Sequence, residues 1–273
     1  MPEKPEVLTV VKSLKKEIIG KRITDVEILW DNMIENPTPK QFKEGIRNQK
    51  IEDITTRGKW IVIHLTNKVL LIHLRMEGKF FFRRKGDLIN KHEHVIFTFD
   101  DDRQMRFHDV RKFGKMHLLD KENYLTISPL KEIGYEYNDV HLTSSYLQDK
   151  LKKKSIPIKT SLLDQSIIAG IGNIYDDEIL YLSRINPYRK SNTITEKECS
   201  QIIKSTREVL DRAIEFGGTT IKSFTSSEGV HGLFQQELLV HGKRNELCPK
   251  CRTKIEVVKI NGRSTYYCPK CQK

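Results

Sequence analysis

The first residues of the chain, Met-Pro-Glu-Lys-Pro-Glu-Val, place a proline second and a carboxylate third. If Met1 is removed, Pro2 carries a free secondary amine with Glu3 directly beside it. An α-amino group has a pKa of ~7.7–8.0, against ~10.4 for lysine, so part of it is neutral and nucleophilic at cellular pH. A neighbouring carboxyl group can donate a proton. The pair is therefore a candidate nucleophile and acid, and the alternative is an accident of where translation starts.

A second chemical pattern is a pair of Cys-Pro-Lys-Cys knuckles near the end of the chain, Cys248 to Cys251 and Cys268 to Cys271, separated by 16 residues. Four thiolates at this spacing fit one tetrahedral Zn²⁺. A pair of redox disulfides is the alternative, but no thioredoxin-like βαβ pattern surrounds the knuckles. Because four thiolates close the coordination sphere, this zinc is expected to hold structure and not to activate water.

The residues between the two knuckles predict a hairpin, with strands on either side of Asn261-Gly262. Basic side chains surround it: Lys250, Arg252, Lys254, Lys259, Arg263, Lys270 and Lys273. A basic hairpin held by a metal suits a nucleic-acid backbone, although any zinc-ribbon protein could carry one.

Composition supports an anionic partner. The 273 residues include 48 Lys and Arg against 36 Asp and Glu, a formal net charge of +12. Solubility alone could account for this excess, but a polyanion such as nucleic acid is the commonest partner of so basic a chain. No apolar run approaches the ~20 residues that span a bilayer, and lysines interrupt the first apolar stretch. We therefore expect a cytoplasmic protein without a membrane segment.

Two types of periodicity divide the chain. A helical apolar stripe covers residues 5–19, and strand-like runs follow to about residue 130, which predicts an N-terminal β-sandwich. Helical patterns then run from 144 to 216, and the last of them opens with a capping box at Thr195 and Glu198. The glycine-rich stretch 217–234 predicts a mobile loop before the cysteine hairpin.

Gly170-Ile171-Gly172-Asn173 precedes one of the predicted helices. Tyr175 stands where a dinucleotide fingerprint needs its last glycine, and no strand is predicted before Gly170, so a nicotinamide site is not expected. Backbone N–H groups at a helix N-terminus still bind anions, and Asn173 adds a donor. A phosphate site and a simple turn between helices both remain open.

Together, three of these stretches resemble the formamidopyrimidine-DNA glycosylases, bacterial repair enzymes for oxidised purines: MPEKPEV, AGIGNIYDDE and the cysteine hairpin. Further matches extend the resemblance over essentially the whole chain: RGKW at 57–60, HLRMEGKF at 73–80, DVRKFG at 109–114, LLDQ at 162–165 and GGTTI at 217–221. The resemblance implies an α+β protein of three parts. These are a β-sandwich domain (1–130), a helix-two-turns-helix domain (131–238) whose loop 217–232 caps the lesion, and a zinc finger (239–273).

The resemblance also implies an activity. Base excision is followed by strand cleavage at oxidised bases or abasic sites in double-stranded DNA, performed by a monomer in the bacterial cytoplasm, at the nucleoid. Pro2 would be the nucleophile and Glu3 the general acid. Lys59 would donate a proton or contact phosphate, Arg263 would bind phosphate and assist the last elimination, and Asn173 would hold a phosphate.

Chemistry supports the order of the first two residues. Attack of the proline nitrogen on the sugar C1′ displaces the base and leaves an iminium, which is cationic without an added proton. That cation acidifies C2′ and drives β-elimination and then δ-elimination, while Glu3 can protonate the ring oxygen. Only a proline at the very first position has the required amine.

A base must leave the duplex before C1′ is exposed, and apolar wedges fill such gaps. The resemblance assigns Met76, Arg111 and Phe113 to this void, whereas a place in the sandwich core is the alternative for Met76 and Phe113. Weaker candidates for phosphate contacts are His73, His92, Lys154 and Lys159. The lysine run that ends at Lys154 would otherwise be a solvated helix end.

Two departures from the family pattern and two rival functions remain. Lys4 stands where leucine is usual, and His241-Gly242-Lys243 replaces tyrosine-glycine-arginine.

An endonuclease VIII-like enzyme for oxidised pyrimidines shares Pro2, Glu3 and the zinc hairpin, but the MEGK segment and the long loop favour the purine enzyme. A non-enzymatic zinc-ribbon DNA binder would make Pro2 incidental.

Overall fold

The computed structural model describes residues 1–219 and 232–273 and divides the chain into two compact units. The N-terminal unit comprises Met1–Lys131 with Thr219–Gly232, and the C-terminal unit comprises Glu132–Gly218 with Leu233–Lys273. Each unit has its own apolar core. The predicted loop 217–234 falls largely on residues 220–231, which lie outside the described part.

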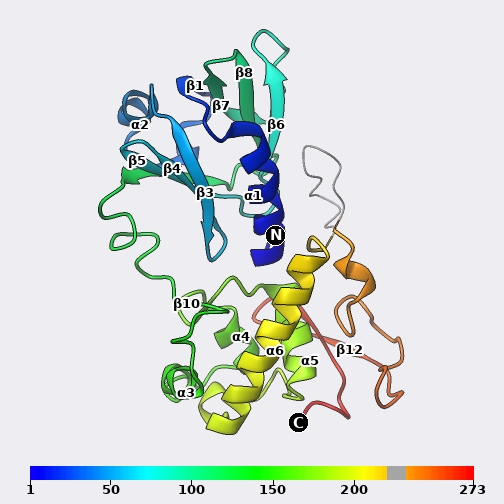
Figure 1. The fold of residues 1–273 in the computed structure, drawn as a ribbon. Coiled ribbons are helices and arrows are strands. Elements are labelled where there is room, and N and C mark those ends of the chain that lie inside the picture. The colour runs from blue at the N-terminus through cyan, green and yellow to red at the C-terminus, as the bar shows by residue number, and fades with distance from the viewer. Residues whose placement is uncertain (220–231) are drawn as a thin grey trace. The chain divides into compact units, whose positions relative to one another are not determined.

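The N-terminal unit is built on two sheets (Figure 1). The four-stranded sheet is antiparallel and has the order β1 (Ile23–Ile28), β7 (Glu93–Phe99), β8 (Arg103–His108), β6 (Lys79–Arg84). The five-stranded sheet has the order β2 (Ile34–Asn36), β9 (Lys115–Asp120), β5 (Lys68–His73), β4 (Trp60–Leu65), β3 (Ile51–Arg57). Inward-facing side chains of both sheets meet in one buried cluster, which confirms the predicted sandwich.

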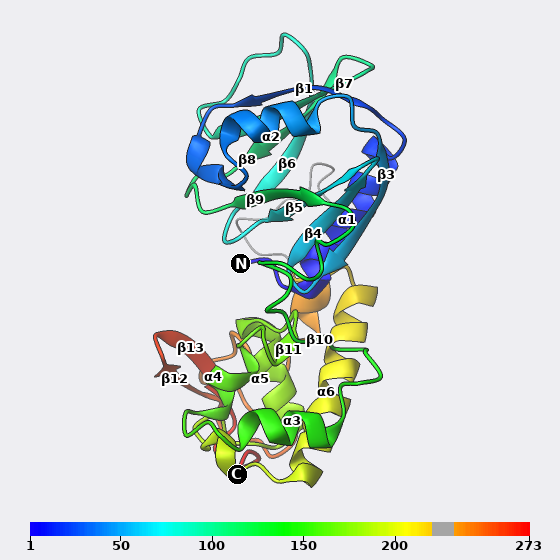
Figure 2. The same cartoon turned by 90° about the vertical axis from the view of Figure 1, so that its left-hand side faces the viewer.

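Two helices complete this core. α1 (Lys4–Ile18) lies beside β3, and its predicted apolar stripe is buried. α2 (Pro39–Ile46) packs against β1 and β9 through Phe42 and Ile46 (Figure 2). The sequence patterns predict neither α2 nor the strands β2 and β9. For α2 a local signal was present, because Thr38 and Gln41 form a capping box and Pro39 stands at the first helical position.

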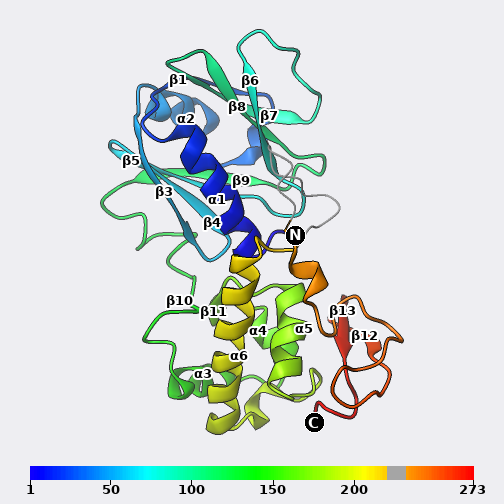
Figure 3. The same ribbon diagram turned by 45° about the vertical axis from the view of Figure 1, so that its right-hand side comes forward.

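The C-terminal unit is mainly helical. Its helices are α3 (Ser144–Leu151), α4 (Ile158–Leu162), α5 (Asn173–Leu182) and α6 (Glu196–Glu215), and α5 and α6 run side by side (Figure 3). The Thr195 hydroxyl accepts from the Glu198 N–H at 3.3 Å, so the predicted capping box starts α6. Short 3-10 helices lie at Ser191–Thr193 and Phe234–Gln236 in this unit, and at Asp31–Met33 in the N-terminal unit.

One expectation is corrected here. A two-residue strand, β11 (Ile168–Ala169), precedes Gly170 and pairs in parallel with β10 (Tyr135–Glu136). It is too short to carry a periodic signal. The C-terminal hairpin is confirmed: β12 (Glu256–Ile260) and β13 (Arg263–Tyr267) flank Asn261 at φ +47° and Gly262 at φ +75°, the left-handed pair that a tight hairpin turn requires.

Among the described residues, no helix is both long and apolar enough to cross a membrane.

Candidate functional site

The N-terminus is ordered by its own first helix. Pro2 and Glu3 are buried, and Glu3 precedes the first turn of α1. The Glu3 N–H donates to Glu6 Oε2 at 2.8 Å, and the Glu3 carbonyl accepts from the Val7 N–H at 3.0 Å. Pro5 suits this turn because the first helical residues need no N–H donor. The candidate nucleophile and acid are therefore held in place by hydrogen bonds to the first turn of α1.

Charged groups of both signs surround the terminal nitrogen. Burial lowers the pKa of the Met1 amino group, Glu3 and Glu6 raise it, and Lys59 lowers it. Lys59 is itself buried and follows the turn at Gly58, whose φ is +54°. The structure thus brings the N-terminus, Glu3 and Lys59 together although 56 positions separate the last two. A partly neutral amine beside a carboxyl and a cation is equipped for nucleophilic attack with proton transfer.

Glu6 has a second set of partners. Its Oε1 accepts from the Thr219 N–H at 2.8 Å and from the Thr219 hydroxyl at 3.2 Å. One carboxylate therefore joins the start of α1 to the residue that directly precedes the undescribed segment 220–231. Sequence reasoning missed this role.

Lys4, the departure that the sequence left unexplained, has a defined contact. Its buried side chain donates from Nζ to Thr56 Oγ1 at 2.8 Å. Thr56 lies on β3, three residues before Lys59. Lys4 therefore ties the start of α1 to the strand that leads to Lys59.

Met76 and Phe113 lie outside the sandwich core, with exposed fractions of 37% and 48%. Both line a cleft of the N-terminal unit with a volume of about 790 Å³, together with Arg111. The Arg111 guanidinium lies 4.7 Å from the centre of the Phe113 ring. A place in the sandwich core is thus excluded for Met76 and Phe113. Together with Arg111 they form an exposed group in the cleft.

A buried carboxylate shapes the loop of residues 109–114, called the wedge loop below. Asp109 accepts backbone N–H groups of Arg111, Phe113 and Gly114 at 3.0, 2.8 and 2.8 Å. The sequence reading gave Asp109 no role. The sequence could have indicated this role, because an Asp at the start of a turn often accepts backbone N–H groups of the next few residues.

The two histidines proposed for phosphate differ in exposure. His73 is buried edge-on against Trp60, and its Nδ1 accepts from the Arg75 N–H at 3.0 Å. Burial, reinforced by Arg75 and Lys59, lowers the pKa of His73 to about 3, so the ring is neutral near pH 7. His92 is only half-buried and meets His108 at 5.6 Å between ring centres. Of the two, His92 is the more accessible to a phosphate.

In the C-terminal unit, Asn173 opens α5 as predicted. Its Nδ2 donates to the Ser264 carbonyl at 3.0 Å, next to exposed Arg263 on β13. Its Oδ1 is buried and has no hydrogen-bond partner among the described residues. Asn173 and Arg263 thus belong to one region of this unit, while Pro2, Glu3 and Lys59 belong to the other unit.

Lys159 requires a correction. It is buried, with Nζ 2.5 Å from Asp177 Oδ1 and 3.7 Å from Asp176 Oδ2. An ammonium that two buried carboxylates hold is not available for a direct phosphate contact. Lys154 is partly exposed, and its Nζ lies 3.0 Å from Asp164 Oδ2. Local sequence could not distinguish these two lysines because their partners lie on other elements.

Asp177 and Glu178 connect α5 to the zinc-finger segment. Asp177 Oδ2 accepts from His241 Nδ1 at 2.7 Å and from the Tyr266 N–H at 3.2 Å. Glu178 accepts three successive backbone N–H groups of residues 239–241 at 2.8–3.0 Å. His241, the second departure from the family pattern, is thus part of a buried polar network that positions the finger.

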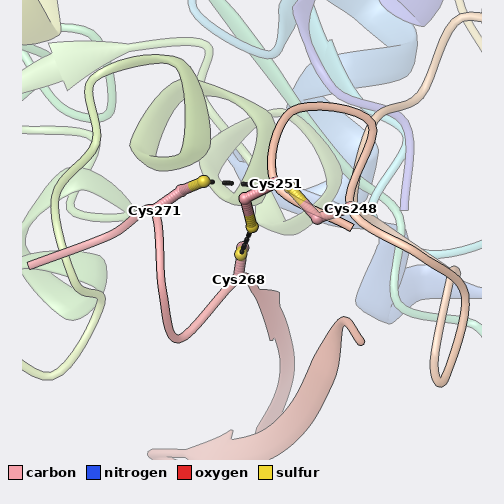
Figure 4. Close-up of side chains that lie close together, drawn as sticks. All are labelled: Cys248, Cys251, Cys268 and Cys271. Atoms are coloured by element: carbon pink, nitrogen blue, oxygen red, sulfur yellow. Dashed lines mark hydrogen bonds between the residues drawn. The ribbon is translucent and has the colours of Figure 1, made fainter. Parts of the chain in front are cut away.

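The four predicted ligand cysteines converge (Figure 4). Their sulfur atoms all lie within 4.8 Å of one another, with Cys251 Sγ to Cys268 Sγ at 3.4 Å and Cys248 Sγ to Cys271 Sγ at 3.9 Å. Tetrahedral Zn–S bonds of ~2.3 Å imply S···S distances of roughly 3.8 Å. The donor set and its size fit one structural Zn²⁺, and all four ligands are cysteines, so no open position remains.

The comparisons with known proteins agree with this geometry. Three family models match: the formamidopyrimidine-DNA glycosylase N-terminal domain over residues 1–116, its H2TH domain over 133–225, and the zinc finger found in FPG and IleRS over 245–273. A formamidopyrimidine-DNA glycosylase of Bacillus cereus is 42% identical over 273 residues, covering 100% of this chain and 99% of the relative. The Bacillus subtilis protein of the same name is 41% identical with the same coverage.

Solved structures agree as well. The Lactococcus lactis protein in complex with DNA containing an abasic site superposes with a TM-score of 0.91 at 36% identity, covering 99% of both chains. Its complex with DNA containing N7-benzyl-Fapy-dG gives a TM-score of 0.90 at 36% identity, covering 100% of both chains. The chain belongs to the formamidopyrimidine-DNA glycosylase family.

Proposed function

We propose that this protein excises oxidised purines, formamidopyrimidines and 8-oxoguanine, from double-stranded DNA and then cleaves the strand at the abasic site. The observation that carries the proposal is the meeting of the N-terminal nitrogen, Glu3 and Lys59 in a chain of this family. Related structures are described as bound to abasic-site DNA or to Fapy-dG DNA, which supports DNA of this type as the substrate.

The reaction begins with the mature N-terminus. Once Met1 is removed, the Pro2 nitrogen attacks C1′ of the damaged nucleotide, the glycosidic bond breaks, and the base leaves with the bonding electrons and a proton. Glu3 protonates the ring oxygen as the sugar opens to the iminium. Loss of a C2′ proton expels the 3′ phosphate, and a second elimination expels the 5′ phosphate. With Met1 in place the same nitrogen is an amide and cannot react.

The positive charge of Lys59 supports these reaction steps. Burial is the main cause that lowers the pKa of the Met1 amino group, Glu3 and Glu6 raise that pKa, and Lys59 lowers it further. A lysine ammonium at this place therefore favours the neutral form of a terminal amine, which is the nucleophilic form. The same ammonium can donate a proton or contact the phosphate next to the damaged nucleotide. Arg263 is proposed to hold phosphate and to assist the second elimination.

The wedge residues, Met76, Arg111 and Phe113, are proposed to fill the space that the flipped nucleotide leaves. Their exposure and shared cleft support this role. Asn173, His92 and Lys154 are proposed as phosphate contacts. For Lys159 and His73 we propose indirect roles, in which Lys159 fixes the start of α5 and His73 packs against Trp60 beside Lys59.

The division into domains 1–130, 131–238 and 239–273, with 217–232 as a lesion-capping loop, is likewise proposed. One structural Zn²⁺ is held by the four cysteines and maintains the finger that carries Arg263. We further propose that the enzyme acts as a monomer in the bacterial cytoplasm, on DNA of the nucleoid.

Excision assays test this function. Mature protein is incubated with duplexes carrying 8-oxoguanine, thymine glycol or no lesion. The proposal predicts cleavage at 8-oxoguanine that leaves phosphate on both sides of a one-nucleotide gap. Faster cleavage at thymine glycol would favour the oxidised-pyrimidine enzyme, and binding without cleavage of any lesion would favour a non-enzymatic zinc-ribbon protein.

A further inference from the structure

The cleft that contains Met76, Arg111 and Phe113 has one more large aromatic residue in its wall, Trp30. The chain has two tryptophans. Trp60 is 8% exposed and belongs to the interior, whereas Trp30 is 37% exposed. Neither the resemblance nor the catalytic chemistry gave Trp30 a role. An exposed indole in a cleft is a surface on which a flat ring can stack.

The backbone that carries Trp30 is held firmly. Trp30 precedes the 3-10 helix Asp31–Met33, and Met33 is fully buried in the sandwich core. Lys115, the first residue of β9 directly after the wedge loop, donates from Nζ to the Asn32 carbonyl at 2.9 Å. The same Nζ lies 2.7 Å from Glu35 Oε2. The segment of Trp30 is therefore fastened to the loop that presents Phe113.

A second contact links Trp30 to that loop. Lys112 lies between Arg111 and Phe113 and has a left-handed backbone with φ +59°. Its side chain reaches Trp30, with Nζ 3.7 Å from the centre of the indole ring. The ammonium holds the indole by a cation–π interaction. Trp30 and Phe113 are thus two aromatic surfaces, each with a cation of the wedge loop at its face.

Charge around the cleft indicates what it binds. Its described lining includes Arg75, Arg111, Lys112 and Lys115, and no carboxylate. Trp30 also lines a second, smaller cavity of about 320 Å³ on the neighbouring segment Leu29–Asn32, so there is open space at more than one part of the ring. Aromatic rings interspersed with cations fit an unstacked nucleobase with its flanking phosphates.

We infer that Trp30 is a stacking surface for the nucleobase that loses its partner when the damaged nucleotide rotates out of the duplex. This inference rests on the proposed function. The wedge residues are proposed to take the place of the flipped nucleotide. The Trp30 indole lies beside them in the same cleft, so it would contact the base on the opposite strand that formerly paired with the damaged nucleotide. Trp30, held by Lys112, would then contribute to the preference for the base opposite the lesion.

A binding cycle tests the inference on full-length mature protein. The first duplex carries a stable tetrahydrofuran abasic analogue opposite cytosine, and the second carries the analogue in both strands, so the opposite base is missing. We expect Trp30→Ala to weaken binding of the first duplex roughly tenfold and that of the second less than twofold. Trp30→Phe keeps a stacking ring and should lose less than threefold on the first duplex.

Ile19→Ala is the matched control, since Ile19 is exposed to a similar extent and does not line the cleft; both affinities should stay unchanged. Equal losses for Trp30→Ala on the two duplexes would show that Trp30 only holds Lys112 or contacts the backbone. Unchanged binding of both would remove Trp30 from the interface. Either result overturns the inference.

A measurement without a disabling substitution provides a second check. Acrylamide quenches exposed indoles, and Trp30→Phe leaves only buried Trp60, whose contribution can then be subtracted. Binding of the first duplex should protect Trp30 from acrylamide, and unchanged quenching would contradict the stacking. Borohydride trapping of the unsubstituted protein on an abasic site distinguishes a failure of the proposed function from a failure of the Trp30 inference. Failure to trap rejects the proposed function, whereas trapping without protection of Trp30 rejects only this inference.

Discussion

The carboxylate of Asp109 holds the backbone of Phe113, whose N–H donates to Asp109 Oδ2 at 2.8 Å. The same buried carboxylate accepts the N–H groups of Arg111 and Gly114. The Asp109 carboxylate therefore fixes the backbone that presents the exposed side chains of the wedge loop. Because carboxylates bind backbone donors more strongly than neutral acceptors do, this residue defines the loop before any DNA arrives.

Asp109→Asn should loosen the wedge loop. The amide keeps one oxygen but turns an NH₂ group toward backbone donors, so we expect a loss of roughly 1–3 kcal/mol in the free energy of unfolding. Affinity for an abasic-site duplex should fall about tenfold, since the wedge residues lose their preset positions. Chemical denaturation and a fluorescence titration measure the two quantities.

Asp102→Asn is the control for that variant. Asp102 is an exposed turn residue with φ +58°, a conformation that asparagine adopts readily. It should change neither stability nor affinity. An Asp109→Asn protein with unaltered stability and affinity would refute the organising role of the carboxylate.

The Lys4–Thr56 contact predicts an asymmetry between two substitutions. Thr56→Val removes the hydroxyl that meets a buried ammonium and should destabilise the protein by roughly 1–3 kcal/mol. Lys4→Leu removes the ammonium itself and should cost less, because leucine suits a buried position. In the double variant the Thr56→Val cost should largely disappear. Additive effects of the two substitutions in denaturation experiments would show that the contact contributes nothing.

His73 predicts a dependence of stability on pH. Burial is the main cause that lowers the pKa of His73 to about 3, while its unfolded pKa is ~6.5. Below about pH 6.5 the unfolded chain therefore binds a proton that the folded chain does not, so stability falls as the pH drops toward 3. This group contributes at most ~1.4 kcal/mol per pH unit.

His73→Asn tests this dependence. Asparagine can still accept the Arg75 N–H but does not titrate, so the variant should lose less stability between pH 6.5 and 4 than the parent. The comparison must be between these two proteins, because burial also lowers the pKa of His64, His94, His108 and His117. Parallel stability curves would contradict the prediction.

Zinc removal should unfold the C-terminal hairpin. The small core there contains Tyr181, Val240 and Ile255 besides the ligands Cys248 and Cys268, too few apolar side chains to hold it without metal. Chelation or Cys268→Ser should abolish the single bound zinc and greatly weaken DNA binding. Cys199→Ser is the matched control, since Cys199 lies in α6 away from the metal cluster, and it should retain one zinc. DNA binding that survives proven zinc loss would refute the structural role.

Local patterns in the sequence were sufficient for the sandwich, the main helices and the zinc ligands. The stripe of α1, the capping box at Thr195 and the Asn261-Gly262 turn are signals that neighbouring residues carry in full. The cysteine knuckles likewise contain both ligands of each pair. Such features need no knowledge of distant contacts.

The remaining features depend on partners far away in the chain. Lys154 and Lys159 lie only five positions apart, yet only Lys159 is buried between carboxylates of α5. Lys4 could be explained only through Thr56, 52 positions later. Trp30 reads as the end of a strand until the wedge loop is placed beside it. Each of these roles is set by tertiary packing, which periodicity does not encode.

The central claim is that the nitrogen of Pro2 attacks the sugar. The most direct test reduces the reaction of mature protein on an abasic-site duplex with borohydride and maps the covalent adduct by peptide mass spectrometry. We expect one adduct on the Pro2 nitrogen, and none from protein that retains Met1. An adduct on Lys59 or another lysine, or an equal yield with Met1 in place, would contradict it.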